Sequence, residues 1–321
     1  MRRWFDEAIA RTRAGAFTVA ALAMLAAAAT AAAHDLPVGD GHVSDHPSIG
    51  DVYACQQDFR GGGARHVGDW FHGDTWDPLA KPHVAGRVMW PQATQTLQVA
   101  GDAVSVQGNG LPVGQPTGIF PIATSDPVYQ YDTNPNPIQA QTLSFKIPSK
   151  PVRAAQASCL PMGMIGFTVT GVALYSALDD AGRDAAAHEV QDLCDGHPQG
   201  KGQYHYHSSS PCLPGAEGDA VVGWALDGYP ILGMRDAKGA LLKDRDLDGC
   251  HGRAEAVDID GRHYDYAYRM TQEYPYIMGC FSGQVLPQTR QAIRASMGPP
   301  RPRGRRGMPP PPDAQGTRPD H

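Results

Sequence analysis

Three histidines that lie close together in the chain are the side chains best suited to bind a metal ion. His205 and His207 alternate with Tyr204 and Tyr206, and His197 precedes them in a Gly-His-Pro turn. On an extended strand, both imidazoles would point to one face with Cα atoms about 6.5 Å apart. Their nitrogens could reach one ion at about 2.0–2.1 Å. The pattern predicts a zinc or copper site with His197 as third ligand, and hydrogen-bonded rings in an aromatic strand are the alternative.

Other residues could complete or orient this metal shell. Residues 264–267 repeat the tyrosine spacing of residues 204–207, and aligning the two segments sets Asp265 opposite His205. Asp227 precedes Gly228 and fits a hairpin turn, but its carboxylate could also point toward the metal. We expect His251, Asp265 or Asp227 to complete the shell, with Asp195, Tyr204 and Tyr206 as supporting residues.

An enzymatic alternative arises from the best helix candidate in the body, residues 181–193. This segment contains His188-Glu189-x-x-Asp192, which is similar to the His-Glu-x-x-His motif of zinc peptidases but lacks its second histidine. In a metal-dependent hydrolase, the ion would activate water and Asp227 or Glu189 would act as general base. An open coordination position in a cleft would favour this alternative, whereas a closed shell of four ligands would favour a structural metal.

A second metal-binding pattern covers residues 244–255, D-R-D-L-D-G-C-H-G-R-A-E. Its spacing is that of a calcium loop, in which Asp244, Asp246, Asp248 and Glu255 would converge around a turn at Gly249. The flanking segments lack the pattern of long helices, so the sequence does not predict an EF-hand. The alternatives are an acidic turn and, as a third class of function, a calcium-braced extracellular adhesion or structural module.

The N-terminus and the cysteines indicate export. Residues 1–33 combine early arginines, an apolar run and a final stretch of alanines, which is typical of a secretory signal peptide. We expect cleavage after Ala33, a periplasmic or extracellular location and no transmembrane span in the mature chain. An even number of cysteines in an oxidising compartment predicts up to three disulfides. Proximity suggests the pairs Cys194–Cys212, Cys250–Cys280 and Cys55–Cys159.

Charge is unevenly distributed along the chain. Residues 34–287 hold 16 Lys and Arg and 29 Asp and Glu, a net charge of −13, whereas residues 288–321 hold seven Arg and two Asp, a net charge of +5. An acidic body disfavours nucleic acid and favours cations. Residues 288–321 are rich in Pro and Arg and should form a disordered tail, in which residues 288–297 could begin as a short helix. The sequence identifies no protein partner.

The remaining pattern is typical of a β protein. With 37 Gly, 28 Pro and only 19% charged residues, the composition favours turns and short strands. Alternating or apolar strand segments occur at 87–106, 142–147, 164–175 and 221–233. Residues 34–86 should form an irregular arm with the first strands. We expect one all-β or β-rich α+β domain, an antiparallel sandwich or distorted barrel with one or two short helices, stabilised by disulfides.

Four motifs in one order resemble the YHYH-domain family of secreted proteins: G-H-P-Q-G-K-G-Q-Y-H-Y-H, G-W-A-L-D-G-Y-P-I-L-G, L-D-G-C-H-G-R and Y-P-Y-I-M-G-C-F-S-G. Together with upstream segments, the resemblance covers residues 87–287. It implies family positions at Gly196, His197, Gly202, Tyr204, His205, Tyr206, His207, Asp227, Gly228, Cys250 and Gly252. The chain departs from the pattern at Val113-Gly114, Asp265 and Ala267, where histidines would be expected. The resemblance implies a secreted protein and no specific reaction. A secreted metal-binding module is the leading hypothesis, and it rests on the histidines themselves.

Overall fold

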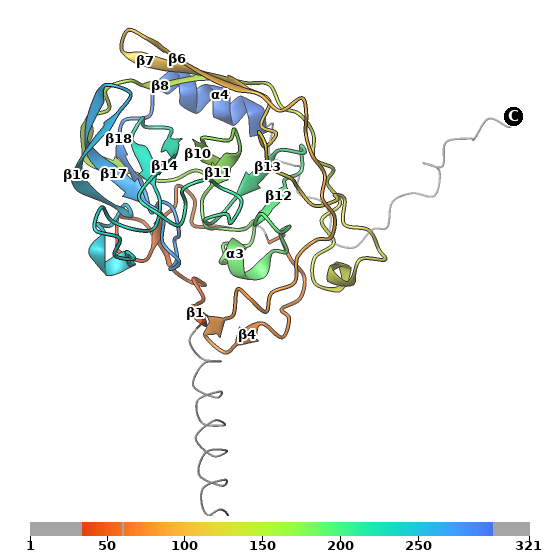
Figure 1. Cartoon of the computed structure of the whole chain (residues 1–321). Coiled ribbons are helices and arrows are strands. Elements are labelled where there is room, and N and C mark those ends of the chain that lie inside the picture. The colour runs from red at the N-terminus through yellow and green to blue at the C-terminus, as the bar shows by residue number, and fades with distance from the viewer. Residues whose placement is uncertain (1–33, 60, 298–321) are drawn as a thin grey trace, which may run out of the picture.

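The computed structural model of the protein describes residues 34–59 and 61–297; the predicted signal peptide and residues 298–321 of the predicted tail lie outside the described residues. Within this part of the chain, the fold is β-rich with two α-helices, as the sequence predicts (Figure 1). The sheets are open, and none of them closes on itself. The structure therefore confirms the predicted class and excludes the distorted barrel.

Four small sheets accompany the central sheet in the described part of the chain. The short N-terminal strands are β1 (Leu36–Pro37), β2 (Val43–Ser44), β3 (Val52–Tyr53), β4 (Phe71–His72) and β5 (Thr75–Trp76). A three-stranded antiparallel sheet contains β6 (Gln95–Ala100), β7 (Ala103–Gly108) and β8 (Leu143–Pro148), and β9 (Arg153–Ser158) pairs with β18 (Phe281–Gly283). The α-helices are α3 (Ala185–His188) and α4 (Pro287–Met297), and the 3₁₀ helices are η1 (Pro127–Gln130) and η2 (Asp244–Asp246).

The central sheet has eight strands in the order β12-β13-β11-β10-β14-β15-β17-β16. Its strands are β10 (Met164–Thr168), β11 (Ala173–Tyr175), β12 (Gly196–Pro198), β13 (Tyr204–Tyr206), β14 (Val221–Ala225), β15 (Pro230–Leu232), β16 (Gly252–Ile259) and β17 (Arg262–Arg269). The pairs β11·β13 and β15·β17 are parallel and the other pairs are antiparallel. The predicted strand segment at 164–175 forms the antiparallel pair β10 and β11, and the predicted hairpin at 221–233 is confirmed as β14 and β15.

The order of the central strands is that of a repeated unit. From the middle outward, one half reads β10, β11, β13, β12 and the other reads β14, β15, β17, β16, so four consecutive strands follow the same path in each half. The halves meet where β10 pairs with β14, with Phe167 directly opposite Trp224 and the two rings stacked 6.0 Å apart. β12 with β13 and β16 with β17 form the two ends of the sheet; in Figure 1, β16 and β17 lie at the left edge of the body and β12 and β13 lie to the right of its centre.

Matching turns support the repeat. Each half has an Asp-x-Cys-x-Gly turn whose aspartate accepts hydrogen bonds from the backbone N–H of the cysteine and of the glycine. The aspartate also accepts one from a tyrosine hydroxyl on the second strand after the turn, β13 or β17. These residues are Asp192, Cys194, Gly196 and Tyr204 in the first half and Asp248, Cys250, Gly252 and Tyr266 in the second. The residue before the glycine has a left-handed backbone conformation in both turns, with φ of 56° at Asp195 and 68° at His251.

The helix before the first of these turns is shorter than predicted. We expected a helix over residues 181–193, but α3 is a single turn of four residues. The Asp179 carboxylate accepts from the N–H groups of Ala181 and Arg183, which holds those residues in a turn. Asp184 caps the helix and Glu189 leaves it in an extended conformation. Local side-chain hydrogen bonds thus override the helix propensity of the alanines.

The outer segments cover the central sheet. Residues 34–86 have mostly irregular backbone, yet Val52, Trp70 and Trp76 are buried in the same core as the central strands. Helix α4 packs along β8, and its Thr289 hydroxyl donates to the carbonyl of Lys146. It occupies residues that the sequence assigned to the start of the tail.

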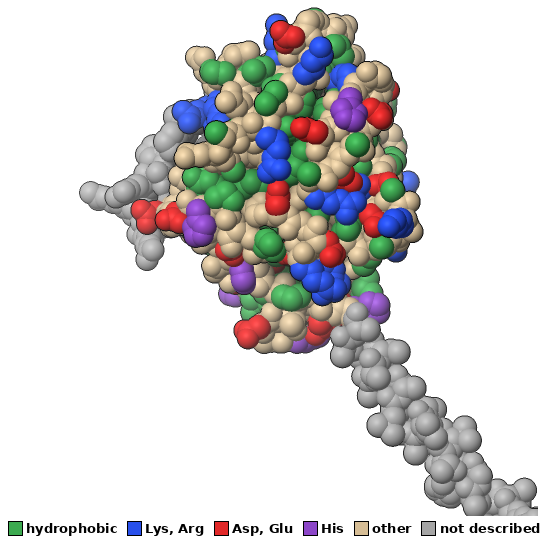
Figure 2. Space-filling view, turned by 90° about the vertical axis from the view of Figure 1, so that its left-hand side faces the viewer, with side chains coloured by type: hydrophobic (Ala, Val, Ile, Leu, Met, Phe, Trp, Pro, Cys, Tyr) green, Lys and Arg blue, Asp and Glu red, His purple; other side chains and the backbone are tan. Residues whose placement is uncertain are grey.

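All three predicted disulfides are present, Cys55–Cys159, Cys194–Cys212 and Cys250–Cys280. The second and third occupy equivalent places in the repeat, because each begins at the cysteine of an Asp-x-Cys-x-Gly turn. No helix among residues 34–59 and 61–297 is long and apolar enough to cross a membrane. On the face in Figure 2, acidic and basic side chains are interspersed, without the continuous basic surface that nucleic-acid binding would require.

Candidate metal centre

The three histidines lie on two paired strands at one end of the central sheet. The antiparallel register of β12 and β13 places His197 directly opposite His205. His197 is therefore in a strand and not in the turn that the sequence suggested, while the predicted extended backbone at residues 204–206 is confirmed. The alternation of β13 turns His205 and His207 to the same side, and their Nε2 atoms are 3.0 Å apart.

Backbone carbonyl groups fix the orientation of two of these rings. The Nδ1 atom of His205 lies 3.1 Å from the carbonyl of Gln203, and that of His207 lies 2.6 Å from the carbonyl of Ser176. A carbonyl oxygen can only accept a hydrogen bond, so each Nδ1 carries the proton and each Nε2 of a neutral ring exposes a lone pair. Two lone pairs 3.0 Å apart repel each other unless a cation lies between them.

Two further unsatisfied groups face the same point. Both ring nitrogens of His197 and the Oε2 atom of Glu189 are buried, and no residue in the described part of the chain makes a hydrogen bond to them. Oε2 of Glu189 lies 3.4 Å from Nε2 of His197 and 3.5 Å from Nε2 of His207. Buried polar atoms without partners are costly, so this concentration of them needs an explanation.

The spacing of these atoms fits the ligand shell of a small metal ion. Ligands at about 2.0–2.1 Å in a tetrahedron are separated from one another by about 3.3 Å. The distances given above run from 3.0 to 3.5 Å. Among the residues that the structure describes, His197, His205 and His207 are the only group of three or more potential ligands whose ligand atoms all lie within 4.8 Å of one another. The donor set is three imidazoles with a neighbouring carboxylate.

Burial controls the protonation of the cluster. It lowers the pKa of His197 and His205 well below the ordinary value, and that of His207 to about 4. The rings are therefore neutral near pH 7, which is the form that binds metals. Burial, together with the carboxylates of Asp179 and Asp132, raises the pKa of Glu189 well above its usual range. A cation at the centre would oppose that rise by favouring the carboxylate.

Aromatic and cationic groups surround the cluster. The Tyr175 ring stacks on His205 with ring centres 3.9 Å apart, and its hydroxyl donates to the Gln203 side chain. Lys81 is buried behind α3, where its ammonium donates to the Ala186 carbonyl and the Gln191 side chain. Burial lowers the pKa of Lys81 to about 8. The histidine cluster thus has a rigid stacked wall on the Tyr175 side.

The predicted supporting residues lie beside the cluster without joining it. The Tyr204 hydroxyl donates to Asp192, and the Tyr206 hydroxyl donates to Gln115, on the face of β13 opposite the histidines. Asp195 is half-buried in the left-handed turn before β12. Burial raises the pKa of Asp195 to about 7. These residues position β12 and β13, and the ion would not contact the two tyrosines.

The structure places three other predicted residues in the second half, away from the histidines. His251 is buried beside the Thr271 hydroxyl and Asp244. Asp265 is exposed and accepts a hydrogen bond from Tyr229. Asp227 is fully buried, where it accepts from the Tyr268 hydroxyl and from backbone N–H groups.

The predicted alignment that set Asp265 opposite His205 was wrong by two residues. Both strands pair with a glycine-containing strand, and the registers make Tyr206 equivalent to Tyr268. Residues 266–269 therefore correspond to residues 204–207. Both strands have tyrosine at alternate positions, so spacing alone could not distinguish the two alignments.

The structure does not bring together the four carboxylates of the predicted calcium loop, and each of them has partners of its own. Asp244 accepts from Thr271, and Asp246 accepts from the backbone N–H of Lys243. Asp248 holds the Asp-x-Cys-x-Gly turn, and Glu255 pairs with Arg253 and Arg269. The Asp-Gly spacing that matched a calcium loop instead encodes the turn of the repeated unit.

Glu189 is the donor that sequence reasoning did not assign to the metal shell. The sequence indicates only a role as general base for Glu189, because this residue forms part of an incomplete peptidase motif. The structure brings it to the histidines because it leaves α3 in an extended conformation, directly after the single helical turn. Its sequence signal was the pair His188-Glu189. His188 itself points elsewhere, to Asp40 and Phe71.

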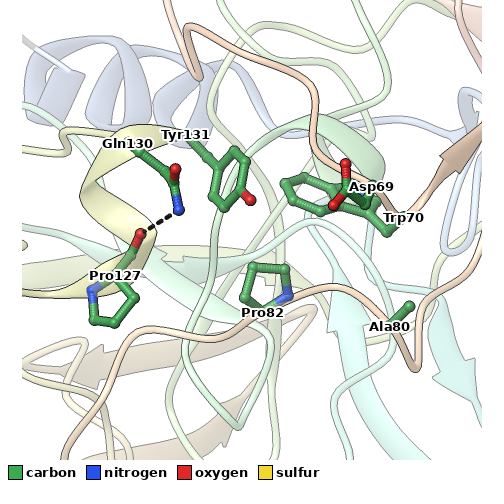
Figure 3. Close-up of a pocket in the computed structure, with 7 residues that line it drawn as sticks. All are labelled: Asp69, Trp70, Ala80, Pro82, Pro127, Gln130 and Tyr131. Carbon is green, nitrogen blue, oxygen red and sulfur yellow. Dashed lines mark hydrogen bonds between the residues drawn. The ribbon is translucent and has the colours of Figure 1, made fainter.

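The cluster is enclosed and not part of a cleft. His197, His205 and His207 are 4%, 2% and 4% exposed. A cavity of about 310 Å³ near α3 is lined by Trp70, Tyr131 and Pro82 among others, and none of the histidines lines it (Figure 3). A second cavity of about 280 Å³ lies by Arg153 and Asp248 in the other half. The geometry favours a closed shell.

Comparisons with known proteins agree with the motif. No curated protein and no solved structure matches the chain significantly. A family model described as YHYH protein matches residues 144–245, a range that extends from β8 to η2 and contains the histidines and Glu189. Residues 144–245 therefore match the YHYH family that the four sequence motifs predicted, over about a third of the chain.

Proposed function

We propose that this chain is an exported metal-binding protein whose YHYH domain holds one transition-metal ion. His197, His205, His207 and Glu189 would be its ligands. The observation that carries the proposal is the 3.0 Å approach of two Nε2 atoms whose Nδ1 atoms both face carbonyl oxygens. Neutral rings in this arrangement expose two lone pairs to each other, and a shared cation removes the repulsion.

Zinc suits these ligands best. Three imidazoles with a nearby carboxylate are common zinc ligands, whereas calcium prefers oxygen donors and copper(II) prefers tetragonal geometry. Carbonyl groups that accept from Nδ1 are the usual outer partners of metal-binding histidines. The burial of the cluster supports a structural ion more than a hydrolytic one, because hydrolysis needs an open position for water.

Export is part of the proposal. Three disulfides are compatible with an oxidising compartment, and the N-terminal 33 residues have the pattern of a secretory signal. Expression with this segment should yield periplasmic protein whose N-terminal sequence begins at His34. Recovery of the full-length chain from the cytoplasm would contradict export without affecting the metal site.

Metal analysis of the untagged protein tests the proposed function. We expect about one equivalent of zinc per chain by mass spectrometry after exposure to zinc and removal of excess metal. The variant His205→Ala/His207→Ala should lose it. The control is His263→Ala, because His263 is an exposed histidine paired with Asp258 far from the site in the second half. A wild-type protein that stays metal-free with both zinc and copper, or a double variant that retains its metal, would overturn the proposal.

A further inference from the structure

At the positions equivalent to the three histidines, the second half of the repeat carries arginines and an alanine. The central register pairs Tyr206 with Gly196 in one half and Tyr268 with Gly252 in the other. The parallel pairings agree, since Tyr206 lies opposite Leu174 and Tyr268 lies opposite Ile231. The positions of His197, His205 and His207 are therefore taken by Arg253, Ala267 and Arg269.

Arg269 is held as a buried cation. Its side chain is 2% exposed. Nε and Nη2 of its guanidinium donate to the two carboxylate oxygens of Glu255, at 2.7 and 2.6 Å. Nη1 donates to Asp219 at 2.5 Å and to the carbonyl of Arg235 at 2.7 Å. Such bidentate pairing is strong and geometrically specific, and small Ala267 stands beside it where the first half has a second histidine ring.

Arg269 and the proposed metal ion connect equivalent parts of their respective halves. Arg269 on β17 is bound to Glu255 on β16, to Asp219 just before β14 and to Arg235 just after β15. It therefore ties the outer strand pair to the inner hairpin. In the first half, His207 follows β13 and bonds the carbonyl of Ser176 just after β11, and its Nε2 faces His197 on β12. An ion at this point would join the outer pair to the inner hairpin in the same way.

The carboxylates that face the two cations come from different places. Glu189 follows α3, whereas Glu255 lies within β16, at the position that Gln199 occupies in the first half. Arg269 and the proposed ion thus occupy equivalent places and join equivalent strands. Their carboxylate partners are not equivalent. Either solution satisfies buried polar groups at one end of the sheet.

We propose that the metal ion is a structural crosslink, the counterpart of the Arg269 guanidinium in a duplicated unit, and that it does no chemistry. This inference rests on the proposed metal site and adds its role. One copy of the unit would link its outer strand pair to its inner hairpin through a metal ion, and the other copy makes the same link through an ion-paired arginine.

A transplant of the second-half residues tests the role. The variant His205→Ala/His207→Arg copies Ala267 and Arg269, leaves Glu189 as partner, and is compared with His205→Ala/His207→Ala. Neither variant should bind zinc. We expect the alanine variant to melt at the temperature of the chelator-treated wild type, and the arginine variant to regain at least half of the difference from the zinc-loaded wild type. Equal melting temperatures for the two variants would overturn the inference.

A spectroscopic measurement keeps the test independent of folding of the variants. In the cobalt-substituted wild type, a closed structural shell predicts intense visible bands that excess azide leaves unchanged. A spectrum that azide shifts would reveal an open coordination position and overturn the structural role. Absence of metal from the wild type would instead overturn the proposed function, so the two failures are distinguishable.

Discussion

Single side chains would set the chemistry of the proposed metal centre, and Glu189 would decide its net charge. Three neutral imidazoles leave the full charge of a divalent ion uncompensated in a buried site, and the carboxylate offsets half of it. The His197 ring has no hydrogen-bond partner in the described part of the chain, whereas carbonyl groups orient His205 and His207. Metal binding should therefore order His197 more than the other two rings.

Replacing Glu189 by glutamine keeps its size and removes its charge. We expect Glu189→Gln to weaken zinc binding by about 10- to 100-fold, because the ion loses its anionic ligand. Competition with a chromophoric chelator measures the affinity. Glu217→Gln is a matched control, since Glu217 lies outside the site in an exposed loop. Equal affinities in wild type and Glu189→Gln would exclude Glu189 as a ligand.

Lys81 provides a pH test next to the site. Burial lowers its pKa from the ordinary 10.5 to about 8. Between these pH values the unfolded chain binds a proton that the folded chain does not, so stability rises with pH. Relative to Lys81→Met, the wild type should gain up to about 3 kcal/mol from pH 8 to 10.5. Urea unfolding across this range gives the difference, and parallel curves for both proteins would show that Lys81 titrates normally.

At the scale of elements, sequence pattern predicted the strands better than the helix or the turns. The apolar runs at 164–175 and 221–233 are strand pairs because both of their faces are covered. The helix predicted at 181–193 is a single turn because Asp179 and Asp184 accept from backbone N–H groups at its start, and Asp132 accepts from the N–H of Val190 after it. His197 is in a strand because β12 is completed only by its pairing with β13, a tertiary contact.

The disulfide Cys194–Cys212 closes the segment that carries all three histidines. Its 18-residue separation predicts a loss of about 3 kcal/mol in the variant Cys194→Ala/Cys212→Ala, measured by denaturant unfolding. We also expect at least tenfold weaker zinc binding, since the apo loop gains freedom that binding must remove. Cys250→Ala/Cys280→Ala removes the equivalent disulfide, with a separation of 30 residues. That control should lose similar stability but keep its zinc affinity; a parallel loss of affinity would contradict local coupling.

Over the whole molecule, the sequence revealed the class, the disulfides and the histidine cluster, but not the repeat. The repeat was hidden because its shared residues are few: an Asp-x-Cys-x-Gly turn, a Tyr-x-Tyr strand and a glycine at each central hairpin. The second turn also matched a calcium loop, which offered a competing explanation of the same aspartates. Only the strand order and register show that these residues hold the same positions in both halves.

A repeat with one metal ion predicts that metal removal acts on one half. Hydrogen exchange followed by mass spectrometry should show faster exchange in β11, β12 and β13 after chelation, while β15, β16 and β17 keep their protection. The reason is that Arg269 holds the second half without metal, and proteins open in local cooperative units. The segments also lie at opposite ends of the sheet (Figure 1).

The reverse experiment uses Arg269→Met in the zinc-loaded protein. This variant leaves the half-buried carboxylate of Glu255 without its main partner and removes the link to Asp219, so β16 and β17 should lose protection while β12 and β13 retain it. Its zinc content should equal that of the wild type, because the two cations lie in different halves. Opposite exchange patterns for chelation and for Arg269→Met would mean that each half depends on its own cation. Uniform acceleration across all eight strands in either case would mean that the sheet opens as one unit, and that the two cations do not stabilise separate halves.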